Sequence, residues 1–163
     1  MYSSVHDKKI NNYCKKFGID KVFCDNEFSY FPETNRISYT IIQYTTDDII
    51  IQLINKKYNV DIEPFYFIFS LLHEIGHHMT IDELTDEEWE NDLMCRQMVI
   101  PYIEDEVGQG KAYINLTAED LATSWAINYI RNNLEECVRT QDRFVKIINH
   151  YYKKKSFRKV LTR

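Results

Sequence analysis

The chain has 163 residues and a net charge of −5 at pH 7. A chain of this length fits one domain, which can bury about 68–70% of its unfolded surface without disulfides or a structural metal. The negative charge argues against a general nucleic-acid-binding surface. The charge is uneven, however: residues 139–163 contain nine Lys/Arg and one Asp, a local +8, which leaves −13 for residues 1–138.

The cysteines and the apolar runs favour a reduced, cytoplasmic protein. The cysteines are Cys14, Cys24, Cys95 and Cys137. They are widely spaced and form no C-x-x-C pair, so neither a thiolate zinc site nor a redox pair is indicated. Residues 1–7 lack the apolar core of a signal peptide, and the longest nearly apolar run, Phe65–Leu72, is too short to span a bilayer. We therefore expect a single-domain cytoplasmic protein with no membrane partner.

The first 44 residues predict one helix and then a small sheet. The helix covers Val5–Phe17, with Ser4 as its N-cap and Gly18 at the C′ position. Residues 19–44 are rich in β-branched and aromatic residues with a period of two, which is typical of strands. Pro32–Asn35 forms a turn between two of them. We expect about three antiparallel strands, whose order the sequence does not show.

Two helices are predicted next. The first begins at Thr45, with Asp48 as its capping partner, and runs to about Tyr58. The second, Phe65–Met79, is apolar on nearly every face in its first half, which predicts burial in the domain centre. Gly76 inside this helix costs about 1 kcal/mol relative to Ala. We expect a neighbouring element to approach closely at that position.

The end of this helix reads H-E-I-G-H-H from residue 73 to residue 78 and contains H-E-x-x-H. Residues four apart share a helix face, so His73 and His77 can present two imidazole nitrogens to one metal ion, at about 2.0–2.1 Å for zinc. Glu74 beside them can accept a proton from a metal-bound water. Metal ligation would also offset the cost of unpaired buried polar groups, about 1–3 kcal/mol each. The same pattern arises by chance in unrelated helices, so the surrounding sequence must decide.

The following helix supplies candidate carboxylates. Thr85 and Glu88 form a capping box at its start, and the helix is expected to run to Ile100 and to end by Pro101. Glu88 is therefore expected to act as the capping partner of Thr85 and not as a metal ligand.

Glu90 is predicted to face inward. At about 100° per residue, three residues fall within about 60° of it: Leu93, Met94 and Gln97. Asp92 lies nearly opposite. An inward carboxylate is costly unless it is paired or binds a cation, so Glu90 is the expected third ligand. Glu87 is the alternative ligand, and Glu90 can instead be a solvated residue that the helix dipole stabilises.

Two histidines and one glutamate make a His₂Glu set, which is typical of catalytic zinc with an open fourth position for water. The absence of thiolates favours this zinc site over a Cys-rich structural one. Manganese, iron and cobalt are also compatible with these donors.

The C-terminal third is predicted to be helical. A loop with Gly108 and Gly110 precedes a helix that starts at Thr117. The core-facing stripe of this helix is expected to be Leu121, Trp125, Ala126, Tyr129 and Ile130. A last helix, Glu135–Lys159, ends in the basic segment Lys153–Lys159. Such a segment is most often a solubilising tail, and binding to an acidic partner or to nucleic acid is the alternative.

Over about Phe65–Pro101 the chain resembles the ImmA/IrrE family of small zinc metallopeptidases, a minimal gluzincin type. In that family an apolar helix enters H-E-L-G-H, and E-A-N-x-F-A-x-x-L-L-M-P follows. Here the second part reads E-N-D-L-M-C-R-Q-M-V-I-P from Glu90 to Pro101, without a gap. Asn-Asp in place of Ala-Asn, and Met-Cys in place of Phe-Ala, are departures that resemble packing variants. A weaker similarity continues in Leu121–Ile127.

The resemblance implies an α+β, mostly helical fold of minimal zincin type, with the small sheet beside the H-E-x-x-H helix. Residues 1–132 would form the metallopeptidase-like core and residues 133–163 a basic helical extension. His73, His77 and Glu90 would ligate zinc, and Glu74 would act as general base.

The resemblance also implies an activity. The chain would be a zinc-dependent endopeptidase whose protein substrate is a repressor-type transcriptional regulator, encoded on a phage or mobile element. It does not imply which residue stabilises the transition-state oxyanion, for which His78, Tyr102 and Tyr113 are the candidates. The alternative is a non-catalytic protein that keeps the scaffold and sequesters a regulator or a host defence protein. The intact Glu74 argues against that alternative, because a binding module has no need of a general base.

Overall fold

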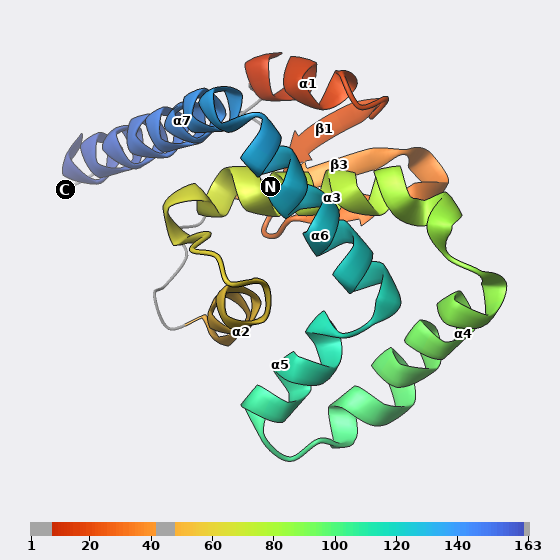
Figure 1. The fold of residues 1–163 in the computed structure, drawn as a ribbon. Helices are drawn as coiled ribbons and strands as arrows, with labels where there is room; N and C mark the ends of the chain where they lie inside the picture. The colour runs from red at the N-terminus through yellow and green to blue at the C-terminus, as the bar shows by residue number, and fades with distance from the viewer. Residues whose placement is uncertain (1–7, 42–47, 162–163) are drawn as a thin grey trace.

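The computed structural model describes residues 8–41 and 48–161, with side chains described only as far as residue 152. The chain folds into an α+β, mostly helical structure with a three-stranded sheet, as the sequence predicts (Figure 1). The strands are β1 (Lys21–Cys24), β2 (Ser29–Phe31) and β3 (Arg36–Tyr39). The helices are α1 (Lys8–Lys15), α2 (Ile49–Tyr58), α3 (Tyr66–Thr80), α4 (Asp86–Met94), α5 (Glu106–Ile114), α6 (Thr117–Asn132) and α7 (Leu134–Leu161).

The sheet has the order β1-β3-β2 and is mixed, so the expectation of an entirely antiparallel sheet is wrong for one strand. β2 is antiparallel to β3 because the single turn Pro32–Thr34 joins them, and Asn35 reverses the chain with φ 45°. β1 is parallel to β3. The chain between β1 and β3 contains β2 itself, and this crossover brings β3 back in the direction of β1.

Local signals placed the ends of the first two helices. Gly18 follows α1 with φ 83°, a conformation that favours glycine, as expected of a C′ residue. The start of α2 differs from the prediction, because the helix begins at Ile49 and not at Thr45. Asp48, the expected capping partner, is itself the N-cap and accepts hydrogen bonds from the N–H groups of Ile50 and Ile51. The predicted caps Ser4 and Thr45 lie outside the described residues.

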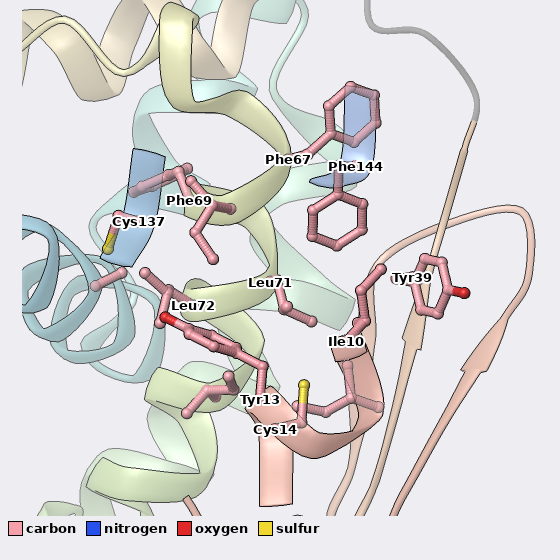
Figure 2. Close-up of a cluster of buried hydrophobic side chains, with 14 of the residues drawn as sticks. Ile10, Tyr13, Cys14, Tyr39, Phe67, Phe69, Leu71, Leu72, Cys137 and Phe144 are labelled. Atoms are coloured by element: carbon pink, nitrogen blue, oxygen red, sulfur yellow. The ribbon is translucent and has the colours of Figure 1, made fainter. Parts of the chain in front are cut away.

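The predicted burial of the H-E-x-x-H helix is confirmed. Ile68, Leu71, Leu72 and Ile75 of α3 are fully buried. Rings from other elements surround them, and the ring of Phe144 from α7 stacks on that of Phe67 (Figure 2). Because Cys137, Phe144 and Ile148 belong to the same core, the first half of α7 is integral to the domain.

The helices α3 and α6 cross in the middle of the molecule at very short range (Figure 1). A Cβ atom on Gly76 would lie 2.6 Å from the carbonyl oxygen of Ala122, so only glycine allows this approach. The expected close neighbour of Gly76 is therefore α6. The predicted stripe of α6 is confirmed in part, since Ala126 is buried and Trp125, Tyr129 and Ile130 pack against the core while partly exposed. The fully buried face consists largely of small residues: Ala118, Glu119, Ala122, Thr123, Ala126 and Ile127.

The segment between α3 and α6 follows the prediction as far as Met94, the last residue of α4. Thr85 caps α4 in a complete capping box with Glu88, as predicted. After Met94 the helix continues as one π-helical turn, Cys95–Val99, and a 3₁₀ turn, Ile100–Tyr102. Such π-helical turns are rare and often lie at functional sites.

The expected loop around the two glycines is instead the helix α5. Asp105 caps this helix by accepting a hydrogen bond from the N–H of Gly108 at 2.6 Å. Gly110 lets α5 pack closely on α2, since a Cβ atom there would lie 2.8 Å from Leu53.

The remaining predictions concern a membrane and the basic C-terminal segment. Among the described residues no helix combines the length and apolar character that a bilayer crossing requires. The basic segment Lys153–Lys159 belongs to α7, but its side chains lie outside the described residues.

Candidate metal centre

The two histidines of the motif project from the same side of α3. The ring centroids of His73 and His77 are 4.7 Å apart, and the rings are nearly perpendicular. Both side chains are partly buried, with 15% and 21% of their surface exposed. One helix therefore presents two imidazoles to one small volume, as the four-residue spacing predicts.

The carboxylate that lies with these histidines is Glu119, in the first turn of α6. Its side chain is only 3% exposed. Oε2 of Glu119 lies 3.0 Å from Nε2 of His73, and Oε1 lies 3.5 Å from Nε2 of His77. One ligand atom from each of these three residues lies within 4.8 Å of the others.

This donor set fits a divalent metal ion. For metal–ligand bonds of about 2.0–2.1 Å in tetrahedral geometry, neighbouring ligand atoms lie about 3.3–3.4 Å apart. The two His–Glu distances, 3.0 and 3.5 Å, bracket that value. Two imidazole nitrogens and a carboxylate oxygen suit zinc and several other transition metals, so the donors are consistent with a metal ion without identifying it.

Glu90 does not join this group, and the expectation that it faces inward is wrong. Glu90 is exposed on α4, as is the alternative Glu87. Asp92, which the helical wheel placed on the opposite side, is buried with 6% of its surface exposed. Of the expected inward neighbours, Leu93 and Met94 are 47% and 53% exposed.

The orientation of α4 has an electrostatic cause. The carboxylate of Asp92 accepts hydrogen bonds from the N–H groups of Thr117 at 2.9 Å and Ala118 at 2.7 Å, the first residues of α6. Leu116 at the N-cap position offers no side-chain cap, so Asp92 supplies it from another helix. The side of α4 that carries Asp92 therefore faces the protein, and Glu90 faces solvent. The same contact holds the first turn of α6, which carries Glu119.

Two further side chains support the group. Oγ1 of Thr123 lies 3.2 Å from Nδ1 of His73, which leaves Nε2 to face Glu119. Such partners on the second imidazole nitrogen orient metal-ligating histidines. Arg96, in the π-helical turn, donates a hydrogen bond to Oε1 of Glu119. Neither Thr123 nor Arg96 belongs to a sequence motif that indicates this role.

Charges within the group keep Glu119 ionised. Burial by itself raises the pKa of this carboxyl, but the hydrogen bond from His73 and the charges of His73, His77 and Arg96 outweigh burial and lower the pKa to about 2. Burial and the nearby His73 charge lower the pKa of His77 to about 4. Burial lowers the pKa of His73, but the hydrogen bond to Glu119 and the charges of Glu74 and Glu119 outweigh burial and raise it. An ionised carboxylate and neutral imidazoles are the forms that bind metal, so metal binding would release the proton that Glu119 favours on His73.

Glu74, the predicted general base, lies beside the group. Burial raises the pKa of its carboxyl to about 7, against the opposing charge of His73. The carboxylate also accepts a hydrogen bond from the backbone N–H of Tyr30 in β2, so the sheet helps to position it. A pKa near neutrality is suited to proton transfer.

Two cavities meet at this site. One has a volume of about 380 Å³ and a wall whose surface is mainly apolar, although polar and charged residues also line it, and the other has a volume of about 390 Å³ and a more polar wall. The residues common to both walls are Glu27, Phe28, Glu74, Tyr113 and Glu119. The candidate metal-binding group of His73, His77 and Glu119 therefore lies where the two cavities join.

The three candidate oxyanion donors, Tyr113, Tyr102 and His78, have different positions in the structure. Tyr113 lines both cavities, and its hydroxyl is hydrogen-bonded to Glu119. Tyr102 is 77% exposed and lines neither cavity. His78 is engaged through Nδ1 with the hydroxyl of Tyr30 at 2.9 Å. Only Tyr113 has its hydroxyl at the group.

A signal for Glu119 was present in the sequence. Glu119, Ala122, Thr123 and Ala126 follow an i, i+3, i+4, i+7 pattern of small residues behind one carboxylate. Such a face is the complement that Gly76 requires. The larger apolar residues of α6 indicated a different face as the buried one. Trp125 and Tyr129 pack against Phe17 on that other side of the helix.

Comparisons of the chain with family models, with curated proteins and with solved structures found no match.

Proposed function

We propose that this chain is a zinc-dependent endopeptidase with His73, His77 and Glu119 as metal ligands and Glu74 as general base. The observation that carries the proposal is the convergence of a His₂Glu donor set beside the half-buried Glu74 at the junction of two cavities. Three protein ligands leave a fourth position for water, which is the arrangement of catalytic zinc rather than structural zinc.

The mechanism assigns a separate task to each side chain. Zinc bound to this group would supply a Lewis acid that lowers the pKa of water to about 7 and polarises a carbonyl. Glu74 takes the proton of the attacking water on a carboxylate oxygen and then delivers it to the nitrogen of the leaving amine. Thr123 and Arg96 hold the ligands His73 and Glu119 in orientation.

Tyr113 is the proposed donor to the developing oxyanion. Its ring stands against the guanidinium of Arg96, with Cζ 5.2 Å from the ring centroid. Burial and the charge of Glu119 raise the pKa of the hydroxyl, so it keeps its proton at neutral pH. The hydroxyl is hydrogen-bonded to Glu119 and would turn from that carboxylate to donate to the oxyanion. A preplaced donor of this kind contributes about 10²–10³-fold in rate.

The proposed substrate is a protein, and the resemblance to the ImmA/IrrE family suggests a repressor-type regulator. That resemblance would place the third ligand at Glu90, whereas the proposal takes Glu119 because of its distances to the two histidines. The proposed zinc and the proposed substrate class rest on the resemblance and the donor chemistry together.

The test compares wild type with Glu74→Gln, which keeps all three ligands but removes the base. We expect both proteins, purified without chelators, to contain about one zinc per chain by elemental analysis. Immobilised, zinc-loaded Glu74→Gln should bind the substrate protein, which is then eluted. Wild type should cleave this eluted substrate about 10²–10⁴-fold faster than Glu74→Gln does.

Glu87→Gln is the matched control, because Glu87 is an exposed glutamate on α4. This control should bind zinc and cleave like wild type. Wild-type protein without stoichiometric metal, or undiminished cleavage by Glu74→Gln, would refute the proposal.

A second candidate function is sequestration of a protein partner without cleavage. The observation in its favour is the exposed apolar surface on α4 and the π-helical turn, since such patches often mark interaction sites. Under this candidate, Glu74→Gln would retain the full biological effect of the chain. Loss of that effect with zinc content unchanged favours the peptidase.

A further inference from the structure

We propose that the apolar cavity beside His73 is a specificity pocket that takes a large apolar side chain, such as leucine or phenylalanine, from the residue next to the cleaved bond. The inference rests on the proposed function and names a class of substrate for it. It comes from the position, the lining and the size of this cavity.

The cavity opens directly onto the metal-binding group. His73, Glu74 and Glu119 form part of its wall, and Thr123, which contacts His73, forms another part. A side chain in the cavity would therefore belong to a residue whose backbone lies at the ligands. Neighbouring residues of the same peptide would extend toward the second, more polar cavity, which shares Glu74 and Glu119.

The interior of the cavity is apolar. It lies among side chains from β2's flanking loop and from α2, α3 and α5: Phe28, Ile50, Ile51, Ile54, Phe69 and Ile114. The hydroxyl groups on the wall already have partners, since Tyr66 is hydrogen-bonded to Ser70 and Thr123 contacts His73. Apart from Glu74 and Glu119, the cavity wall contains two carboxylates. Glu27 is exposed, and Asp48 caps α2. An incoming lysine could pair only with these carboxylates and would lose water on entry, whereas an apolar side chain would be buried against the six apolar residues.

The size also matches a large side chain. A volume of about 380 Å³ lies within the range of about 300–1,000 Å³ that is usual for ligand pockets. Dry apolar cavities of about 150 Å³ hold a benzene molecule. Glycine or alanine would leave most of the space unfilled, so the cavity should discriminate by apolar volume. One methylene in an apolar pocket is worth about 10–200-fold in discrimination.

The experiment measures binding and does not depend on turnover. Acetylated amino-acid hydroxamates, which chelate zinc through the hydroxamate group, are titrated into the zinc-loaded full-length chain by calorimetry. The side chains are those of glycine, alanine, leucine, phenylalanine and lysine. We expect leucine or phenylalanine to bind at least about tenfold more tightly than alanine, and lysine to bind more weakly than leucine.

A charge on the cavity wall should change this order. Ile50 is half-buried at the start of α2, and Ile50→Glu should bring lysine hydroxamate to equal or exceed leucine hydroxamate. Leu53 is the matched control: it lies on the same helix and is half-buried, but it is not on the cavity wall. Leu53→Glu should leave the order of the series as in wild type.

The outcomes separate the two proposals. A zinc-loaded chain that binds alanine and leucine hydroxamates equally, or prefers lysine, overturns the specificity pocket and leaves the peptidase proposal standing. A change of order in Leu53→Glu as large as that in Ile50→Glu also overturns it. A chain that does not take up zinc overturns both.

Discussion

The α3–α6 pair and the segment from α4 to α5 differ in the contacts that fix the positions of their helices. In the pair, Gly76 lets α3 contact the backbone of Ala122, and the facing side chains are buried. On α4 and the π-helical turn, large apolar side chains are instead 45–64% exposed: Trp89, Leu93, Met94, Met98 and Val99. There a buried hydrogen-bonded carboxylate, Asp92, fixes the orientation. In the tightly packed pair, the close approach expected at Gly76 is present. On α4, the inner face that the helical repeat placed around Glu90 is exposed, because Asp92 fixes the opposite side toward the protein.

The largest expected effect concerns the metal. Glu119→Gln should weaken zinc affinity by more than about 100-fold, because it removes the charge of the proposed ligand in the buried α3–α6 pair. Glu90→Gln should change the affinity less than about threefold, since Glu90 is exposed. Competition with a chromophoric chelator measures both values. A larger loss in Glu90→Gln than in Glu119→Gln would restore Glu90 as the ligand.

The next effect is a pH dependence of stability in the metal-free protein. The pKa of Glu74 is about 7 in the folded state, above the value of about 4.5 expected when it is unfolded. The folded state therefore binds more protons between these values, and the stabilising contribution of Glu74 is present below about pH 4.5 and lost as the pH rises through 7. Glu74→Gln should gain up to about 3 kcal/mol relative to wild type between pH 4.5 and pH 8.

Chemical denaturation at the two pH values measures this gain. Glu87→Gln, an exposed glutamate on α4, provides the comparison and should show no more than a few tenths of a kcal/mol. Equal pH profiles of wild type and Glu74→Gln would contradict the buried position of this carboxyl.

An intermediate effect is expected at the contact between the two regions. Asp92→Ala removes the cap of α6 and leaves two N–H groups without their partner, which should cost about 1–3 kcal/mol of unfolding free energy. It should also weaken zinc binding, because the first turn of α6 carries Glu119. Glu90→Ala, two residues away, should change stability by less than about 0.5 kcal/mol. Thermal unfolding with and without zinc distinguishes these variants.

The smallest effect tests the exposed apolar surface. Met98 is 64% exposed, so Met98→Ser should change the unfolding free energy by less than about 0.5 kcal/mol. Leu71→Ala, in the fully buried part of α3, should cost about 2–5 kcal/mol. A cost above about 2 kcal/mol for Met98→Ser would show that another part of the chain or a second copy covers this surface.

Much of the fold followed from local sequence. The burial of α3, the capping box of Thr85 with Glu88, the positive φ of Gly18 and the close approach at Gly76 were all predictable, because each depends on residues near in sequence or on the residue itself. The direction of β1 and the helix α5 were not. Strand direction depends on a crossover, and α5 contains two glycines, one of which is explained only by its contact with α2.

The sequence by itself determined the two histidines and the glutamate of the motif, because the helical repeat alone places His73, Glu74 and His77 at one end of a buried helix. Only the tertiary structure decided the third carboxylate. Glu119 stands 42 positions after His77 and reads locally as an ordinary acidic residue in a helix's first turn. Its place beside the histidines depends on Gly76, which sets the distance between α3 and α6, and on Asp92, which holds the start of α6 from another helix. Both are long-range contacts. The small-residue face from Glu119 to Ala126 indicates that another helix can approach closely, but the periodicity does not show which helix that is.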